Sequence, residues 1–266
     1  MAPQKKLSME DMIDEQLGLQ IEISYKRHRE FMLMYGLGEC RTVVDLGTAN
    51  GLFLHTLATD HPNITFHGID SNEMRISQAK QYGNINVEWL VGNINDPEFL
   101  FPLLNKADGV LMRYFLLHLT NVDDLLGNLA QTLKKNASLW IFDLDLDNLK
   151  CEPPHDALEN IRHIVQSFFD THSLESPAGK NLRTLLEKNR FTNIQMKEEP
   201  YSNQNIHINS FKKFILNELR LYNWDLYGTP ESDKIRDVEK FLDEEEIKTG
   251  KRVLNYGMSM VGAKLG

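Results

Sequence analysis

Five short runs of β-branched and apolar residues, each followed by a segment with helical spacing, constrain the fold of this chain most strongly. In chain order, the runs are Thr42–Leu46, Ile64–Asp70, Asn86–Val91, Ala107–Met112 and Ser138–Leu146. Strands that alternate with helices are joined by right-handed crossovers and form a parallel sheet with helices on both faces. The sequence therefore predicts an α/β fold with a doubly wound, mostly parallel sheet.

The rest of the chain contains no repeat and no low-complexity linker, so we expect one continuous structure in three parts. Helical spacing over Met9–Tyr35, as two helices or one bent helix, predicts a helical cap over residues 1–38. Residues 39–150 form the core of the sheet. The segments of residues 151–266 are too short and scattered for a domain of their own. We expect them to complete the sheet, with Val253–Val261 as a last strand, and to form the pocket for a substrate.

Composition excludes several classes of protein. A formal net charge of −9 disfavours a dedicated nucleic-acid-binding protein, because phosphate contacts depend on clustered cations. No apolar run is long enough for a membrane span or a secretory signal. The two cysteines, Cys40 and Cys151, fit neither a metal pair nor a disulfide framework. We therefore expect free thiols, a cytoplasmic location and no membrane contact, while monomer and homodimer both remain open.

The segment after the first predicted strand gives the first indication of a ligand. From Asp45 it reads Asp-Leu-Gly-Thr-Ala-Asn-Gly, so small residues occupy positions 47, 49 and 51. Small residues let the backbone turn tightly and let a ligand approach the main chain. In an open α/β sheet, ligands bind beyond the carboxyl ends of the strands at this point. A dinucleotide fingerprint from Gly47 would need a glycine at Leu52, which disfavours a nicotinamide-dependent reductase.

Two later positions suit a nucleoside. Asp70 ends the second strand, where a carboxylate can accept hydrogen bonds from both ribose hydroxyls, although an ordinary surface acid is the alternative. Met74 can lie flat against adenine, although a helical methionine is more often part of a core. Together they favour an adenosine-containing ligand.

The spacing of an acid and three small residues from Asp45 resembles the first motif of class I S-adenosylmethionine-dependent methyltransferases. Ala49 replaces the usual glycine of that family. Asn93, after the third strand, replaces the acid that in this family meets the exocyclic amine of adenine, and its amide oxygen is still an acceptor. The segment from Arg113, Arg-Tyr-Phe-Leu-Leu-His-Leu, resembles the family pattern R-x-x-L-x-H-L of small-molecule methyltransferases. The resemblance covers about residues 40–201 and the last strand. It is specific for the superfamily and weak for any one substrate.

This resemblance implies a Rossmann-like, seven-stranded sheet and S-adenosylmethionine as cofactor. It also implies methyl transfer to an oxygen or nitrogen of a small-molecule acceptor by in-line displacement. The alternatives are an RNA or protein methyltransferase, or a non-catalytic subunit that binds S-adenosylmethionine. The expected cofactor-binding residues are Asp45, Gly47, Ala49, Gly51, Asp70, Ser71, Met74, Asn93, Ile94 and Arg113.

Two residues are candidates for catalysis. His118 follows the fourth strand and can take a proton from a hydroxyl acceptor, since imidazole titrates close to neutral pH. A structural histidine at the start of a helix is the alternative. Tyr25, Arg27 and His28 lie on the N-terminal helix, which in this family often closes over the donor. We expect one of them, Tyr25 first, to contact the donor carboxylate or the acceptor. Arg113 lies near the donor carboxylate in this interpretation, or else pairs with an acid such as Asp45.

Two further sets of residues have competing interpretations. Asp143, Asp145 and Asp147 alternate along the fifth strand, but nothing in the spacing gives them further ligands, so we expect no metal site. A set of later aromatic residues either lines the acceptor pocket or forms part of a core. Its members are Phe168, Phe169, Phe211, Phe214, Tyr222, Trp224 and Tyr227.

Overall fold

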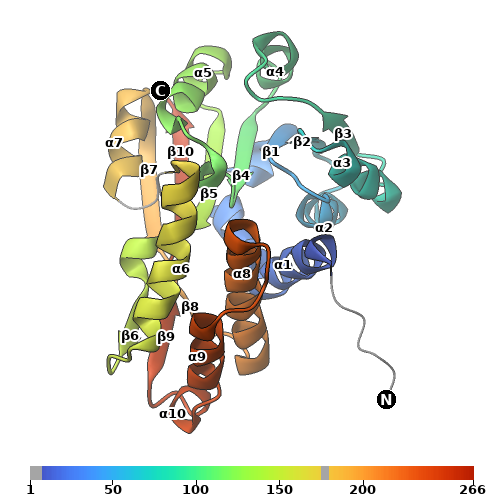
Figure 1. Cartoon of the computed structure of the whole chain (residues 1–266). Coiled ribbons are helices and arrows are strands. Elements are labelled where there is room, and N and C mark those ends of the chain that lie inside the picture. The colour runs from blue at the N-terminus through green and yellow to red at the C-terminus, as the bar shows by residue number, and fades with distance from the viewer. Residues whose placement is uncertain (1–7, 175–179) are drawn as a thin grey trace. The chain divides into compact units, whose positions relative to one another are not determined.

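The large sheet of the protein contains the five strands of the predicted alternating pattern and two strands from later in the chain (Figure 1). The computed structural model describes residues 8–174 and 180–266. In sheet order the strands are β3 (Val87–Val91), β2 (Thr65–Asp70), β1 (Thr42–Leu46), β4 (Gly109–Arg113), β5 (Ser138–Leu144), β10 (Met258–Leu265) and β7 (Phe191–Glu198). The pairs from β3 to β5 are parallel, and β10 pairs antiparallel with both β5 and β7. The structure thus confirms a doubly wound, mostly parallel, seven-stranded sheet.

Strand β1 lies where the strand order reverses. Leu46 of β1 is level with Ile69 of β2 on one side and with Met112 of β4 on the other. The chain therefore leaves β1, β2 and β4 at the same edge of the sheet. In open α/β sheets this edge, at the reversal point, is where ligands bind.

Helices pack on both faces of the large sheet. Those that follow the strands are α2 (Leu52–Asp60), α3 (Glu73–Ala79), α4 (Pro97–Leu104), α5 (Val122–Thr132) and α7 (Lys180–Lys188). On one face, buried side chains of α4, α5 and α7 join those of β1, β4 and β5 in one apolar cluster. All seven residues of β5 are buried, as expected for a strand covered on both faces.

Helix α1 (Met9–Met34) is one helix, whereas the sequence was consistent with either two helices or one bent helix. Ser8 caps it, because the Ser8 hydroxyl accepts the backbone N–H of Asp11 at 3.1 Å. Near its other end, Phe31 packs edge-on against Phe142 of β5, with ring centroids 5.8 Å apart. The carbonyl of Tyr35 accepts the indole N–H of Trp140 at 3.2 Å. The last turns of α1 therefore cover the face of the sheet opposite to α5.

The described residues divide into two compact units according to their contacts. Each unit is built from three separate segments of the chain. The sheet unit comprises residues 25–147, 180–199 and 258–266, and the helical unit comprises residues 8–24, 148–174 and 200–257. These limits differ from the predicted borders at residues 38 and 150. The physical reason is that α1 contributes to both units and that β7 and β10 return to the large sheet. The scattered later segments thus gather in a unit with contacts of its own.

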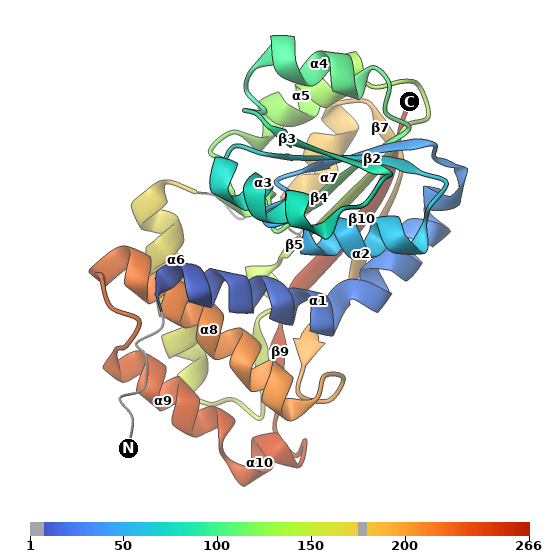
Figure 2. The ribbon, with the colours of Figure 1, turned by 90° about the vertical axis from the view of Figure 1, so that its right-hand side faces the viewer.

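The helical unit combines the first part of α1 with later helices and a small sheet, and Figure 2 shows α6, α8, α9, α10 and β9. Its elements are β6 (Lys150–Glu152), α6 (Ala157–His172), β8 (Tyr201–Ser202), α8 (Ile208–Tyr227), α9 (Asp233–Leu242), α10 (Glu245–Lys248) and β9 (Val253–Tyr256). The strands pair antiparallel in the order β6-β9-β8. The predicted last strand Val253–Val261 is therefore two strands, because the chain changes partners at Gly257 and β10 begins at Met258.

Most of the aromatic residues predicted for a pocket belong to the core of this unit. Phe169, Phe211 and Phe214 are buried, and Phe168 stacks on Tyr222 with ring centroids 4.4 Å apart. Within the two described ranges, no helix has both the length and the apolar character that crossing a membrane requires.

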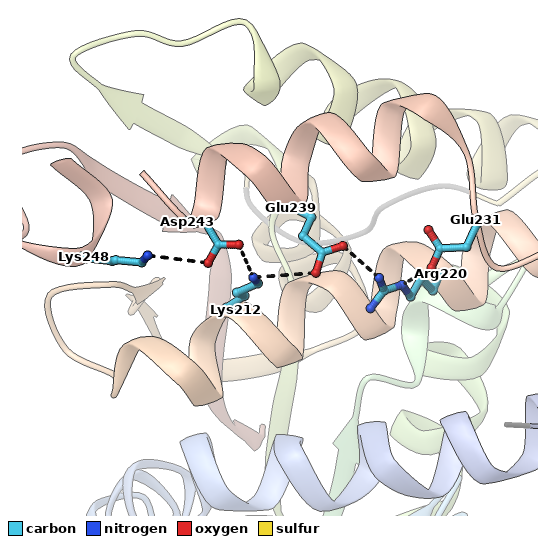
Figure 3. Close-up of polar contacts among 6 residues, drawn as sticks. All are labelled: Lys212, Arg220, Glu231, Glu239, Asp243 and Lys248. Atoms are coloured by element: carbon cyan, nitrogen blue, oxygen red, sulfur yellow. Dashed lines mark hydrogen bonds and ion pairs between the residues drawn. The ribbon is translucent and has the colours of Figure 1, made fainter. Parts of the chain in front are cut away.

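A chain of ion pairs joins α8 to α9 on the surface of the helical unit (Figure 3). Lys212 of α8 lies 2.6 Å from Asp243 and 3.6 Å from Glu239. Arg220, two turns further along α8, lies 3.1 Å from Glu239 and 2.8 Å from Glu231. Glu239 thus bridges two cations, and the set forms a network rather than isolated pairs.

Candidate active site

The loop between β1 and α2 holds alternate residues in the left-handed backbone region. The φ angles are +75° at Gly47, +50° at Ala49 and +74° at Gly51. A Cβ atom at Gly47 would lie 2.2 Å from the ring of Phe115, and one at Gly51 would lie 2.6 Å from Ala79. Glycine is therefore required at 47 and 51 by both conformation and space. Ala49 adopts the same region with a side chain, which is strained for an L-residue.

Asp70 connects this loop to the end of β2. Its Oδ2 accepts the backbone N–H of Ala49 at 2.9 Å, and its Oδ1 accepts that of Asn72 at 2.9 Å. The N–H groups of Gly47 and Thr48 both donate to the carbonyl of Ile69 at 2.9 Å. The carboxylate is half-buried and fixed in direction. Each oxygen has room for a second hydrogen bond, so the pair can accept the two hydroxyls of a ribose.

Apolar side chains are exposed next to Asp70. Met74 in α3 is 47% exposed and Val91 at the end of β3 is 45% exposed. Met74 is therefore not a core residue, which removes the alternative interpretation of this position. Ile94, three residues after Val91, is half-buried. Such side chains offer the apolar surface that a planar ring requires.

The polar positions after β2 and β3 are exposed. The side-chain oxygen of Asn93 accepts the N–H of Asn95 at 2.9 Å, which orients its amide. Ser71 is exposed directly after Asp70. The structure is thus compatible with both as ligand contacts.

Asp45 is buried beneath the loop, with 4% of its surface exposed. Burial raises the pKa of its carboxyl to about 6, although the nearby Thr48 side chain and Arg113 guanidinium lower it. A buried carboxyl with a raised pKa at a ligand-binding edge is typical of functional sites.

Arg113 ends β4, and its guanidinium contacts side chains of α1 and α2. Its Nε donates a hydrogen bond to Nδ1 of His28 at 3.2 Å. Its central carbon lies 3.7 Å from the centroid of the Phe53 ring, which belongs to the first turn of α2. His28 is 1% exposed and stacks on Phe142, with ring centroids 4.0 Å apart and planes 8° from parallel.

The turn after β4 is organised by a buried acid. Oδ2 of Asp143 accepts the N–H groups of Leu116 and Leu117 at 2.8 and 3.3 Å, and Oδ1 accepts that of Leu144 at 2.9 Å. Burial raises the pKa of this carboxyl to about 7, and the backbone N–H groups act against the rise. Tyr114 in this turn has φ +48°, which is rare for a bulky residue and often accompanies functional sites.

The other two acids of this strand region have separate surroundings. Asp145 is buried and accepts the hydroxyl of Ser259 at 2.9 Å. Asp147 donates its backbone N–H to Asp145 at 3.2 Å. Over residues 8–174 and 180–266, no group of three or more His, Cys, Asp or Glu side chains is arranged to hold a metal ion.

The two catalytic candidates lie in different surroundings. His118 is exposed at the end of the 3-10 helix Leu116–His118. The hydroxyl of Tyr25 donates to Asp60 at 2.6 Å, and Arg29 lies 3.1 Å from the same carboxylate oxygen. Burial and the contact with Asp60 raise the pKa of Tyr25. Tyr25 is therefore poorly suited to act as a base.

Two residues of this region, Phe53 and Phe115, and one contact, that of His28 with Arg113, were not identified from the sequence. Phe53 supports Arg113, Phe115 packs against Gly47, and His28 contacts Arg113 rather than merely neighbouring Tyr25. A local signal existed for Phe53 and Phe115, since each lies within two residues of a predicted site residue. None existed for the His28 contact, because its partner is 85 residues away.

Comparison with known proteins identifies a family. The family model described as "Methyltransferase domain" matches residues 39–195, more than half of the chain. The probable inactive O-methyltransferase 11 of Dictyostelium discoideum is 26% identical over 116 residues. That match spans 43% of this chain and only 33% of the length of the relative.

Solved structures share the fold. A SAM-dependent methyltransferase from Archaeoglobus fulgidus has a TM-score of 0.55 at 20% identity, covering 91% of this chain and 93% of that one. Phosphoethanolamine N-methyltransferase 2 of Haemonchus contortus, crystallised with phosphomonomethylethanolamine and S-adenosylhomocysteine, has a TM-score of 0.58 at 14% identity. It covers 98% of this chain and 60% of that one. With the strand order and the family match, these findings show that the chain belongs to the class I S-adenosylmethionine-dependent methyltransferase superfamily.

Proposed function

We propose that this protein transfers a methyl group from S-adenosylmethionine to an oxygen or nitrogen atom of a small-molecule acceptor by in-line displacement. The observation that supports this most is the carboxylate of Asp70. Backbone N–H groups from two loops hold it at the edge of the sheet where the strand order reverses. A fixed, half-buried carboxylate at this place is suited to a ribose.

The other predicted residues have parts in the same proposal. Met74 and Ile94 contact the adenine ring, while Ser71 and Asn93 bind its polar atoms and those of the sugar. The loop from Gly47 through Ala49 to Gly51 lets the donor approach the backbone. Arg113 binds the carboxylate end of the donor, and Asp45 supports the loop from below.

The chemistry that remains for the protein is mainly positioning. S-adenosylmethionine, when bound, supplies a methyl group on a positively charged sulfur whose leaving group is neutral. The protein must therefore orient the acceptor, and good orientation alone is worth up to roughly 7–11 kcal/mol. For a hydroxyl acceptor, a base such as His118 adds about 10²- to 10⁴-fold. Selection of the acceptor by residues 151–266 stays a prediction.

The location in the cell is part of the same proposal. Cys40 and Cys151 are both free and buried, which is usual for proteins of the reducing cytoplasm. Burial also raises the pKa of the Cys40 thiol to about 11 and so limits its reactivity.

The proposal is tested by calorimetry with S-adenosylhomocysteine and S-adenosylmethionine. Asp70→Ala should weaken binding about 100-fold, because hydrogen bonds to a charged group contribute about 1.5–3 kcal/mol each. Glu73→Ala is the matched control, since Glu73 is an exposed acid three residues away, and its affinity should equal that of the wild type. No binding by the wild type, or full binding by Asp70→Ala, would contradict the proposal.

Turnover distinguishes the remaining alternatives. A panel of hydroxyl and amine acceptors should give S-adenosylhomocysteine as product. Donor binding without turnover would favour a non-catalytic subunit, an outcome in line with the word "inactive" in the name of the Dictyostelium relative. A salt-sensitive gel shift with RNA would favour a nucleic-acid substrate.

A further inference from the structure

We propose that His28 is a positioning residue whose imidazole fixes the Arg113 guanidinium in the direction needed to bind the carboxylate end of the methyl donor. The inference rests on the proposed function, because it concerns the same site. It assigns to the N-terminal helix a role at the donor, carried by His28 rather than by Tyr25. Four observations support it.

The direction of the hydrogen bond defines the state of His28. Arginine has five N–H donors and no acceptor, so Nδ1 of His28 must accept with a lone pair. The ring proton is then on Nε2, and the imidazole is neutral. Burial, together with the charges of Arg113 and Arg27, lowers the pKa of His28 well below its usual value. His28 is therefore a permanent acceptor at physiological pH.

The ring of His28 is held in one orientation. It is 1% exposed and lies parallel to the ring of Phe142 at 4.0 Å. The Phe53 ring lies on another side, with centroids 6.3 Å apart. Since the ring cannot rotate without displacing these side chains, Nδ1 marks a fixed point for the Nε of Arg113.

Two constraints then determine the plane of the guanidinium. The Nε–H bond points at His28, and the face of the group lies against the Phe53 ring at 3.7 Å. A guanidinium is planar and rigid, so fixing one N–H direction and one face also fixes the remaining N–H groups. Such a fork matches a carboxylate in a bidentate pair, but only when its orientation is correct.

The electrostatic surroundings favour an anion. Phe53 belongs to the first turn of α2, and the start of a helix carries partial positive charge. A guanidinium there is disfavoured electrostatically unless negative charge is nearby. The buried Asp45 carboxyl supplies part of that charge, since burial raises its pKa only to about 6 and Arg113 lowers it, and the guanidinium and the helix start together attract a further anion. An anionic group of a ligand would therefore be stabilised beside Arg113.

The experiment compares two ligands that share the adenosine and the thioether. S-adenosylhomocysteine carries the amino-acid end, and 5′-methylthioadenosine lacks it. We expect His28→Leu to raise the Kd for S-adenosylhomocysteine about 10-fold and to leave the Kd for 5′-methylthioadenosine unchanged. His28→Gln keeps an acceptor oxygen and should recover most of the affinity. Arg29→Gln, on the same helix, is the control and should match the wild type for both ligands.

A double-mutant cycle tests whether His28 acts through Arg113. In an Arg113→Met background, adding His28→Gln or His28→Leu should change no Kd further. An equal loss for both ligands, an unchanged Kd in His28→Leu, or additive losses in the double variants would overturn the inference. His28→Gln keeps the test valid if His28→Leu fails to fold. No binding by the wild type would overturn the proposed function, and with it this inference. Binding by the wild type with any of the contrary results above would overturn the inference alone.

Discussion

The charged side chains discussed above find their partners in different places in the two units: inside the sheet unit and on the surface of the helical unit. In the sheet unit, Asp143 and Asp45 are buried, and Asp143 is held by backbone N–H groups. In the helical unit, Lys212 and Arg220 meet acids of α9 and the turn before it at the surface. Backbone groups are fixed once the fold forms, whereas surface ion pairs must order flexible side chains. The sheet unit therefore has the rigid polar groups that a binding site requires.

The largest expected effect compares two glycines with similar backbone conformation. Gly51 of the sheet unit has φ +74° and Gly228 of the helical unit has φ +68°. A Cβ at Gly51 would clash with Ala79 and Trp89, whereas nothing lies within 4 Å at Gly228. Gly51→Ala should cost about 2–5 kcal/mol, from strain plus overpacking. Gly228→Ala should cost about 1–2 kcal/mol, from strain alone.

Urea unfolding followed by circular dichroism measures both free energies. Equal costs for the two variants would mean that the packing around Gly51 relaxes. Both costs would then come from backbone strain alone.

The second prediction concerns pH, and the two units should respond with opposite sign. The carboxyls of Asp143 and Asp45 have pKa values raised to about 7 and about 6 by burial. Between about pH 4 and pH 7 the folded sheet unit therefore binds more protons than the unfolded chain. Its free energy of unfolding should fall by a few kcal/mol as pH rises through this range, at about 1.4 kcal/mol per unit of pKa shift. Asp143→Asn should flatten this slope.

The helical unit provides the opposite case. The hydrogen bond from Lys212 lowers the pKa of Asp243 below its usual value. The ionised carboxylate of Asp243 therefore stabilises the folded helical unit at neutral pH, and this stabilisation is lost as pH falls through the acid range. Trp224 lies in the helical unit and Trp89 and Trp140 lie in the sheet unit, so Trp224→Phe isolates the fluorescence of the latter. A free energy of unfolding that changes with pH in the same direction in both units would contradict these assigned pKa shifts.

The sequence predicts those features that are encoded within short segments. The loop from Gly47 to Gly51 and Asp70 could be identified because each strand end and the following turn are local patterns. The partners of Arg113 could not, since His28 belongs to a helix 85 residues earlier. Val253–Val261 has uniform alternation, so only the tertiary structure reveals that its two halves join different sheets.

The helical unit was not predicted for the same physical reason. Its segments come from three distant parts of the chain, and its charged helix faces give no sign of their partners. Asp143 is a related case. The sequence predicted no metal site there and gave this acid no other role, whereas the structure shows its carboxylate accepting the N–H groups of a turn 26 and 27 residues earlier.

The third prediction concerns the effect of salt on the ion-pair network of the helical unit. Lys212→Met removes one bridge of the network and should cost about 1 kcal/mol, at the upper end for partly exposed pairs. Raising NaCl from about 0.1 M to about 1 M shortens the screening length from about 10 Å to about 3 Å. Salt should therefore destabilise the helical unit of the wild type more than that of Lys212→Met.

Lys240→Met is the matched control for this experiment. Lys240 and Asp237 form an isolated pair on α9 with side chains 78% and 57% exposed. Its removal should change the free energy of unfolding by less than about 0.5 kcal/mol. An equal effect of both variants would show that the network adds nothing beyond single pairs.

The smallest effect should be the same in both units. Ala49 and Ser173 have φ +50° and +53°, one in each unit. Glycine relieves about 1–2 kcal/mol of strain but costs about 0.5–1 kcal/mol in chain entropy. Ala49→Gly and Ser173→Gly should each stabilise the protein by about 0.5–1 kcal/mol in thermal or urea unfolding. A loss of stability at Ala49 alone would mean that its methyl group has a packing role.

The position of β10 between β5 and β7 determines when the large sheet can be completed during synthesis on the ribosome. Residues 145–257 separate β5 from β10, and translation at about 5–20 residues per second needs on the order of ten seconds for them. Throughout this time the nascent β5 has one edge without its partner, and β7 has no strand to join. Open strand edges promote association between chains. Covering this edge, by chaperones or by the later helices of the chain, would limit such association until translation reaches β10.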